Sequence, residues 1–166
     1  MPAKLKTTKA VLLENLTPQI LREYSLFKLG DAQVTKKFGN ALIDLINSTV
    51  DLRTHNYALY TTNKHPLNNF CKKNSLLLSE IISEKLHIPL FVGEYSYKYD
   101  SSSFYDDHQQ RHDKIHPPFL KDKDKIRDKN YRFLMIDDST VTGTSLQVSI
   151  LELEQVTDNV TFFVLV

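Results

Sequence analysis

Cysteine is almost absent from the sequence, which also lacks long apolar runs and an excess of either charge. Cys71 stands alone, so an internal disulfide and a cysteine-rich zinc site are excluded, and a reducing compartment such as the cytoplasm is expected. Since 21 Lys and Arg are balanced by 20 Asp and Glu, no global field recruits nucleic acid or an anionic membrane. No stretch approaches the ~18 to 20 apolar residues of a membrane span, and no signal peptide is recognisable. We expect a soluble protein whose function depends on a local site.

The size of the chain suits one compact domain. Its 166 residues are 41% hydrophobic, which is enough to form a core without disulfide or metal support. Within a single domain, residues 1–166, we expect an N-terminal edge region over residues 1–50 and a core over residues 57–166. Residues 160–166 are almost all apolar, which is unusual for a free terminus and would suit one piece of a longer polypeptide.

Alternating helix and strand patterns predict the fold class. Apolar residues recur every three or four positions in four segments that we expect to be helical: from Pro18, 33–47, 74–86 and 145–155. Short apolar runs predict strands over residues 57–60, 88–99, 131–136 and 159–166, with 131–136 in the centre, and a weaker alternation predicts a short strand over 24–29. This order predicts an α/β domain, in which a mainly parallel sheet of about five strands is flanked by helices and binds ligands at its carboxyl edge.

Residues 100–130 are polar and charged, with almost no periodicity. An irregular connection longer than ~12 to 15 residues is usually functional or mobile, so we expect a long flexible loop over the site. The alternating charges of residues 121–125 are typical of a solvated tether. Three histidines spaced by four could stack as metal ligands on a helix, but Pro117-Pro118 and the polar surroundings favour a loop without metal: His108, His112 and His116.

Residues 133–145 combine four apolar residues, two acids and a hydroxyl-rich turn at the start of a helix. At a strand end, Asp137 and Asp138 can accept charge-assisted hydrogen bonds from vicinal hydroxyls such as those of a ribose. The turn offers backbone amides, a close approach at Gly143 and the hydroxyls of Thr142, Thr144 and Ser145, all near the positive end of a helix dipole. The pattern therefore predicts a sugar-phosphate site.

This stretch resembles the motif that binds phosphoribosyl pyrophosphate (PRPP) in type I phosphoribosyltransferases. Beyond it, the resemblance covers roughly two-thirds of the chain, in element order only. It implies a type I phosphoribosyltransferase-like fold, with Asp137 and Asp138 at the ribose hydroxyls of PRPP and with Val141, Thr142, Gly143, Thr144 and Ser145 around its phosphate. The implied activity is Mg²⁺-dependent transfer of the phosphoribosyl group to a nucleobase or related acceptor, with release of pyrophosphate.

The resemblance also implies two groups of residues at the pyrophosphate. The loop over residues 61–66 corresponds to the family's short pyrophosphate loop and supplies Thr62, Asn63 and Lys64. The family's flexible loop, which closes over pyrophosphate, falls in residues 100–130, where the cations are Arg111, His112 and Lys114. Magnesium is expected to be held by PRPP oxygens and water rather than by side chains. The implied catalytic residues are Asp137, Asp138, Lys64 and Arg111.

The acceptor and the catalytic competence stay open. Val141 stands two residues before Gly143, where transferases for 6-oxopurines carry an aspartate that contacts the base, so no general base is assigned. Residues 24–31, the only candidate for the variable hood that binds the base, do not reveal which nucleobase it would be. The alternative is a non-catalytic relative that binds PRPP or a nucleotide as a regulatory or partner module. A homodimer is compatible with either function.

A response-regulator receiver domain is a further resemblance, because residues 134–139 look like its acidic first strand. A receiver needs most of its ~100-residue domain after those acids. The sequence of 166 residues has too little chain beyond Asp138 to supply it. We therefore favour the ribose-phosphate interpretation.

Overall fold

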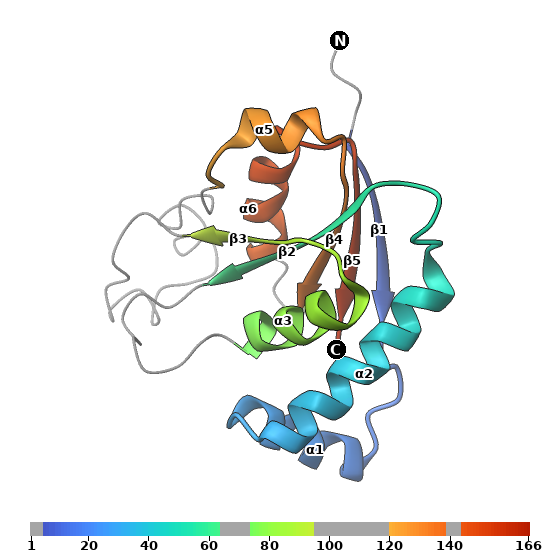
Figure 1. Cartoon of the computed structure of the whole chain (residues 1–166). Coiled ribbons are helices and arrows are strands. Elements are labelled where there is room, and N and C mark those ends of the chain that lie inside the picture. The colour runs from blue at the N-terminus through green and yellow to red at the C-terminus, as the bar shows by residue number, and fades with distance from the viewer. Residues whose placement is uncertain (1–4, 64–73, 95–119, 139–143) are drawn as a thin grey trace, which may run out of the picture.

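The structure is a computed structural model that describes residues 5–63, 74–94, 120–138 and 144–166, without the side chains of residues 63, 94 and 144–148. A five-stranded sheet has the order β1-β5-β4-β2-β3, and each neighbouring pair is parallel. Helices cover both faces of this sheet (Figure 1). The predicted α/β class with a mainly parallel sheet of about five strands is confirmed.

The strands match the apolar runs of the sequence except at one edge. They are β1 Lys6–Val11, β2 Tyr57–Asn63, β3 Leu90–Glu94, β4 Arg132–Asp137 and β5 Asn159–Val164. β4 is the central strand, as predicted, and its residues 133–136 are buried on both faces, which explains their continuous apolar run. β1 was not predicted, because an edge strand can be polar and exposed, and Lys6, Thr7, Thr8 and Lys9 are.

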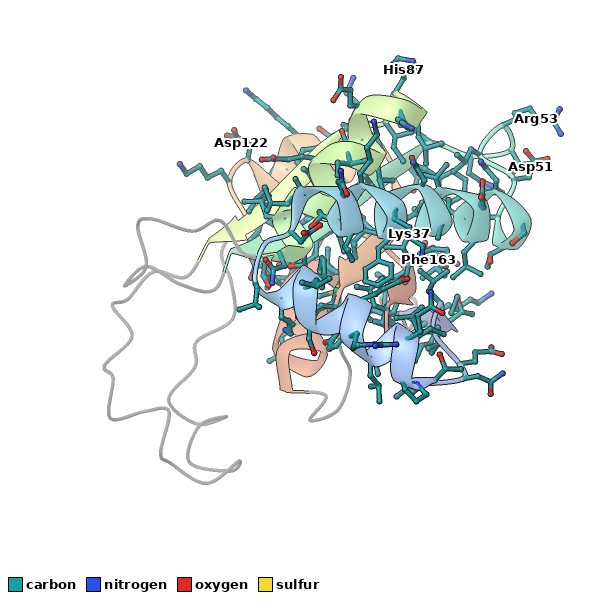
Figure 2. All side chains as sticks on the ribbon, turned by 90° about the horizontal axis from the view of Figure 1, so that it is seen from below. Lys37, Asp51, Arg53, His87, Asp122 and Phe163 are labelled. Carbon is teal, nitrogen blue, oxygen red and sulfur yellow. The ribbon has the colours of Figure 1, made fainter. Side chains whose placement is uncertain are left out.

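Three helices cover one face: α1 Pro18–Lys28, α2 Ala32–Thr49 and α3 Asn74–Leu86. Their apolar side chains pack with those of β2, β4 and β5, and Phe163 of β5 lies within this layer (Figure 2). Gly39 allows α2 to approach α3, because a Cβ at this position would lie 3.1 Å from Cγ2 of Ile81. This contact helps to fix where α3 begins, at the carboxyl edge of the sheet.

The predicted strand over residues 24–29 is wrong, because these residues form the second half of α1 and its C-cap. Thr17 caps the helix by accepting a hydrogen bond from the backbone N–H of Ile20 (3.2 Å), and Pro18 occupies the first turn. Phe27 is fully buried against Phe38 of α2 and Tyr24 is partly buried beside it, whereas Leu26 and Leu29 are 44% and 84% exposed. The burial of Phe27 outweighs the strand-like alternation.

The other face is covered by α5 Lys123–Asp128 and α6 Thr144–Leu153. The prediction of a loop over residues 100–130 is therefore wrong for residues 123–128, which form α5. Residues 121–125 are mostly exposed, as a solvated segment would be, but Lys123 contacts a buried acid. The buried carboxylate of Glu152 accepts a hydrogen bond from the backbone N–H of Leu120 (3.0 Å) and forms an ion pair with Nζ of Lys123 (2.7 Å). Leu120 and Ile126 are buried against the sheet. Two buried apolar residues in this segment and one buried acid in α6 produce no periodic pattern, so the sequence did not predict this packing.

Residues 95–119 lie outside the described residues. They include the second half of the strand expected over residues 88–99, the three histidines and the first part of the expected loop. Within the described residues, no helix combines the length and the apolar character needed to cross a bilayer.

Candidate functional site

The candidate site lies where β4 ends. Asp137 is the last residue of the strand and Asp138 follows it; they are 1% and 9% exposed. β4 has β5 on one side and β2 on the other, so the carboxyl ends of three parallel strands meet here. Ligands of open α/β sheets bind at this edge. The two acids of the motif therefore occupy the position that the sequence predicts.

Backbone hydrogen bonds fix the chain at the acid pair. The backbone N–H of Asp138 donates to Oδ1 of Asp137 (2.8 Å), and the backbone N–H of Val166 donates to the carbonyl oxygen of Asp138 (3.1 Å). Asp138 lies just beyond the last residue of β4, so the alternation of the strand does not fix the direction of its carboxylate. The direction of Asp138 is set by its contact with α1.

Lys28, the last residue of α1, donates a hydrogen bond from Nζ to Oδ2 of Asp138. Nζ also lies 5.8 Å from the centroid of the Tyr24 ring, one helical turn earlier. Burial would lower the pKa of Lys28, but the hydrogen bond and the negative charge of Asp138 outweigh it and raise this pKa. Burial and then the charge of Asp138 raise the pKa of Tyr24. Residues 24–31, expected as a hood, thus supply a cation and an aromatic ring to the acid pair.

Lys28 is a site residue that the sequence analysis did not link to the acids. The available signal is the spacing of Tyr24 and Lys28, which places both on one face only if the segment is helical. We expected this segment to be a strand, in which residues four positions apart are not neighbours, so the spacing did not link Lys28 to Tyr24.

Hydroxyl groups join β2, α3 and β4 at the same edge. Thr61 Oγ1 donates to the carbonyl oxygen of Ile136 (3.1 Å) and lies 3.3 Å from Oγ of Ser75 in the first turn of α3. Nδ2 of Asn74 donates to the carbonyl oxygen of Lys28 (3.4 Å). These contacts bring the start of α3 and the end of α1 to the acid pair.

The structure brings together part of the predicted site. Thr62 of β2 is 1% exposed and, like Asp137 of β4, lies two residues beyond the paired residues Tyr60 and Met135. Asn63 ends β2, and α6 begins with Thr144 and Ser145, whose side chains are not described. The remaining predicted site residues lie outside the described part of the chain: Lys64, Arg111, His112, Lys114, Val141, Thr142 and Gly143.

A resident metal cage does not occur in the part of the chain that the structure describes. No three His, Cys, Asp or Glu side chains are grouped there so as to hold an ion. Asp137 and Asp138 do offer the oxygen ligands that Mg²⁺ prefers, but Lys28 already places a positive charge beside them. The expectation that Mg²⁺ is held by oxygens of PRPP and by water therefore stays a prediction.

Comparisons with known proteins give little more. No family model matches the chain, and no curated protein matches it. Among solved structures, an adenine phosphoribosyltransferase from Thermoanaerobacter pseudethanolicus matches with 15% identity and a TM-score of 0.41, over 81% of this chain and 70% of that one. The protein's own coordinates define its class: an α/β protein with an acid pair at the carboxyl edge of a parallel sheet.

Proposed function

We propose that the protein binds PRPP at the carboxyl edge of β4 and transfers its phosphoribosyl group to a nucleobase or related acceptor, with release of pyrophosphate. One observation carries the proposal: the almost fully buried Asp137 and Asp138 lie at the end of the central strand, a few residues before α6 begins, and the sequence between them and α6 is rich in hydroxyl side chains. Buried carboxylates are costly unless they are hydrogen bonded, and a ribose offers vicinal donors.

The acid pair can hold a sugar while it keeps its contacts within the protein. An ionised carboxylate has two oxygens and about four acceptor sites. Asp137 accepts from the backbone N–H of Asp138, and Asp138 accepts from Lys28, so contacts within the protein hold both carboxylates at the end of β4. In the proposed complex the ribose hydroxyls donate to this pair, and residues 141–145 surround the phosphate at the start of α6.

The reaction proposed for this site is a displacement at the anomeric carbon of the ribose. A bond forms between that carbon and a nitrogen of the acceptor, while the bond to pyrophosphate breaks and its electron pair leaves with pyrophosphate. The transition state resembles the oxocarbenium ion of glycosyl transfer. The acid pair would hold the ribose in line, and its negative charge would favour the positive charge that develops on the sugar.

The leaving group requires positive charge. We assign this role to Lys64 and to the cations Arg111, His112 and Lys114, with Thr62 and Asn63 at the end of β2 as further contacts. Mg²⁺, carried on the oxygens of PRPP, would add charge neutralisation when it is bound.

A non-catalytic PRPP-binding module is the second candidate, and Val141 favours it. This aliphatic side chain cannot accept a proton, whereas an acceptor nitrogen that carries an N–H, as in a purine or pyrimidine base, must lose that proton during transfer. Such a module would bind PRPP or a nucleotide at the acid pair without turnover.

Thermal unfolding with PRPP and Mg²⁺ tests the binding that both candidates share, with nucleoside monophosphates as comparison ligands. At a ligand concentration of about 100 Kd, we expect a stabilisation of about 2.7 kcal/mol, or roughly 5 to 10 °C in Tm. Combined Asp137→Asn and Asp138→Asn substitutions should abolish the shift, whereas Asp44→Asn with Asp158→Asn, two exposed aspartates, should retain it. If wild-type protein shows no shift with any of these ligands, both candidates are wrong.

Pyrophosphate release then separates the two candidates. PRPP is supplied with a panel of nucleobases, and the pyrophosphate released is measured for the wild type and for each of the two double variants. A transferase releases pyrophosphate with at least one acceptor, and the variant with both Asp137→Asn and Asp138→Asn does not. A binding module shows the shift in Tm and no release.

A further inference from the structure

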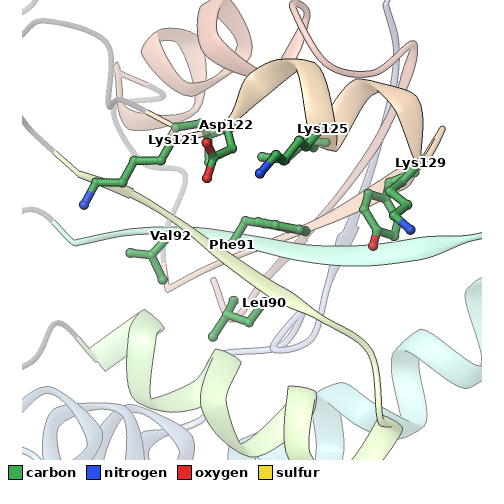
Figure 3. A pocket seen from close by; sticks show the side chains of 10 residues that line it. Leu90, Phe91, Val92, Lys121, Asp122, Lys125 and Lys129 are labelled. Carbon is green, nitrogen blue, oxygen red and sulfur yellow. The ribbon is translucent and has the colours of Figure 1, made fainter.

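A cavity of about 390 Å³ lies between the edge strand β3 and α5 (Figure 3). None of the described residues that line it belongs to the acid pair, α1, α3 or α6. Its volume falls in the range of small-molecule sites, about 300 to 1,000 Å³. The cavity is therefore large enough to hold a ligand of its own, separate from the proposed PRPP site.

Aromatic rings form one wall of the cavity. Phe91 of β3 and Tyr131, just before β4, have ring centroids 5.7 Å apart and ring planes inclined by 55°. Phe133 supports both rings from the core, at centroid distances of 5.9 Å and 6.0 Å. Phe91 and Tyr131 are only partly buried, so ring surface remains for a ligand. A flat aromatic group can add to such a cluster by offset or edge-on contact.

Positive charge surrounds the opening on the α5 side. Lys121, Lys125 and Lys129 are spaced by four residues along this segment, and Asp122 is the one acid among the described residues that line the cavity. Figure 3 shows these four side chains on the α5 side, opposite Phe91 and Val92. Of the three, only Lys125 lies within α5; Lys121 precedes the helix and Lys129 is its C-cap. A bound anion would reduce the repulsion among like charges gathered at one opening. Three ammonium groups and one carboxylate favour an anionic ligand over a neutral or cationic one.

We propose that this cavity binds a small aromatic molecule that carries a carboxylate or a phosphate group. Its ring lies against Phe91 and Tyr131, and its anionic group lies among Lys125, Lys129 and Lys121. Asp122 would accept a hydrogen bond from an N–H or O–H of the ligand. This site is independent of the proposed PRPP chemistry and would exist equally in a transferase or in a binding module.

Fluorescence titration of the full chain with anilinonaphthalene sulfonate, an aromatic anion, tests the proposal. Lys125→Glu with Lys129→Glu reverses two exposed charges at the opening, and Lys6→Glu with Lys36→Glu makes the same change in net charge on exposed residues elsewhere. We expect saturable binding at one site, weakened about tenfold or more by the first pair of changes and less than about twofold by the second. Naphthoate and naphthyl phosphate should displace the probe, and their relative affinities identify the preferred anionic group.

Equal affinity in the two double variants would overturn the proposal, as would binding that does not saturate. So would displacement by naphthylmethanol or naphthylmethylammonium at the concentrations that suffice for the anions, because the site would then be apolar without selecting charge. Amide chemical shifts give the location: ligand-dependent changes must include Phe91 and Ile126. Asp137→Asn protein must bind the probe as the wild type does, so a failure of the PRPP proposal leaves this test intact.

Discussion

Nζ of Lys28 donates a hydrogen bond to Oδ2 of Asp138, 110 residues further along the chain. The contact joins the end of α1 to the end of the central strand and places an ammonium group beside the acid pair. The lysine side chain is 47% exposed and the aspartate side chain 12% exposed, so solvent screens the ion pair from one side only. A half-exposed ion pair of this kind is expected to stabilise the fold modestly and to offset part of the negative charge of the acid pair.

A double-mutant cycle measures the ion pair between Lys28 and Asp138. For Lys28→Met, Asp138→Asn and the double variant, we expect a coupling free energy of about 0.5 to 1 kcal/mol from urea unfolding at neutral pH and low salt. High salt should reduce this coupling. The control is the pair of Lys37 and Glu23, with an Nζ to Oε1 distance of 2.8 Å and a lysine side chain that is 62% exposed. The Glu23 side chain is 19% exposed, so the two pairs differ mainly in the exposure of the lysine. A Lys28 coupling no larger than that of the control pair would show that the lower exposure of Lys28 adds nothing.

The stabilisation from Lys28 should disappear at alkaline pH. Its pKa is raised, so the folded chain keeps this proton at pH values where the unfolded chain has lost it. The contribution is therefore complete below the ordinary lysine pKa of 10.5 and is lost as the pH rises through the folded-state value. Tyr24, whose pKa is also raised, acts in the same direction above its ordinary value of 10.0.

Urea unfolding from neutral to strongly alkaline pH checks this dependence. The difference in free energy of unfolding between wild type and Lys28→Met should be constant from about pH 7 to about pH 9 and then shrink. Tyr24→Phe in both backgrounds removes the contribution of the tyrosine. A difference that stays constant through the alkaline range would mean that Lys28 does not titrate differently in the two states.

The sequence predicts those elements whose burial produces a pattern. Residues 131–136 are a continuous apolar run because β4 is buried on both faces, and residues 33–47 have a helical stripe because α2 buries one side. β1 gives no such signal, since its first residues are polar and exposed at the sheet edge. In residues 24–29 the pattern misleads, because the exposed Leu26 and Leu29 imitate the alternation of a strand.

The candidate site could be predicted only where it is local in the chain. Asp137 and Asp138 lie within one short motif, and the structure places both at the carboxyl edge. Lys28 reaches the motif from 110 residues away, and nothing in the composition of either segment specifies that contact. Long-range pairs of this kind depend on helix packing, which a single sequence does not reveal.

Removal of the buried carboxylate of Glu152 should release the segment that contains α5. Glu152→Ala leaves the backbone N–H of Leu120 and the ammonium group of Lys123 without this acceptor, so we expect a loss of about 2 to 3 kcal/mol. Glu154→Ala, an exposed acid at the end of the same helix, should cost less than about 0.5 kcal/mol. Urea unfolding gives both values. Hydrogen exchange should show faster opening of residues 120–130 in Glu152→Ala only; equal protection in both variants would mean that Glu152 does not hold this segment.

Asp137→Asn should separate ligand binding from folding. The amide oxygen of asparagine can still accept the hydrogen bond from the backbone N–H of Asp138, so the free energy of unfolding should change by no more than about 1 kcal/mol. Loss of the negative charge weakens the hydrogen bonds to the ribose, and the affinity for PRPP should fall roughly tenfold to a hundredfold, since bonds to charged groups contribute about 1.5 to 3 kcal/mol. Calorimetric titration with PRPP and Mg²⁺ measures the change, with the exposed Asp44→Asn as the matched control. If both variants bind PRPP as tightly as the wild type does, the carboxylate of Asp137 does not hold the ribose, because the substitution removes its charge while leaving the strand end in place.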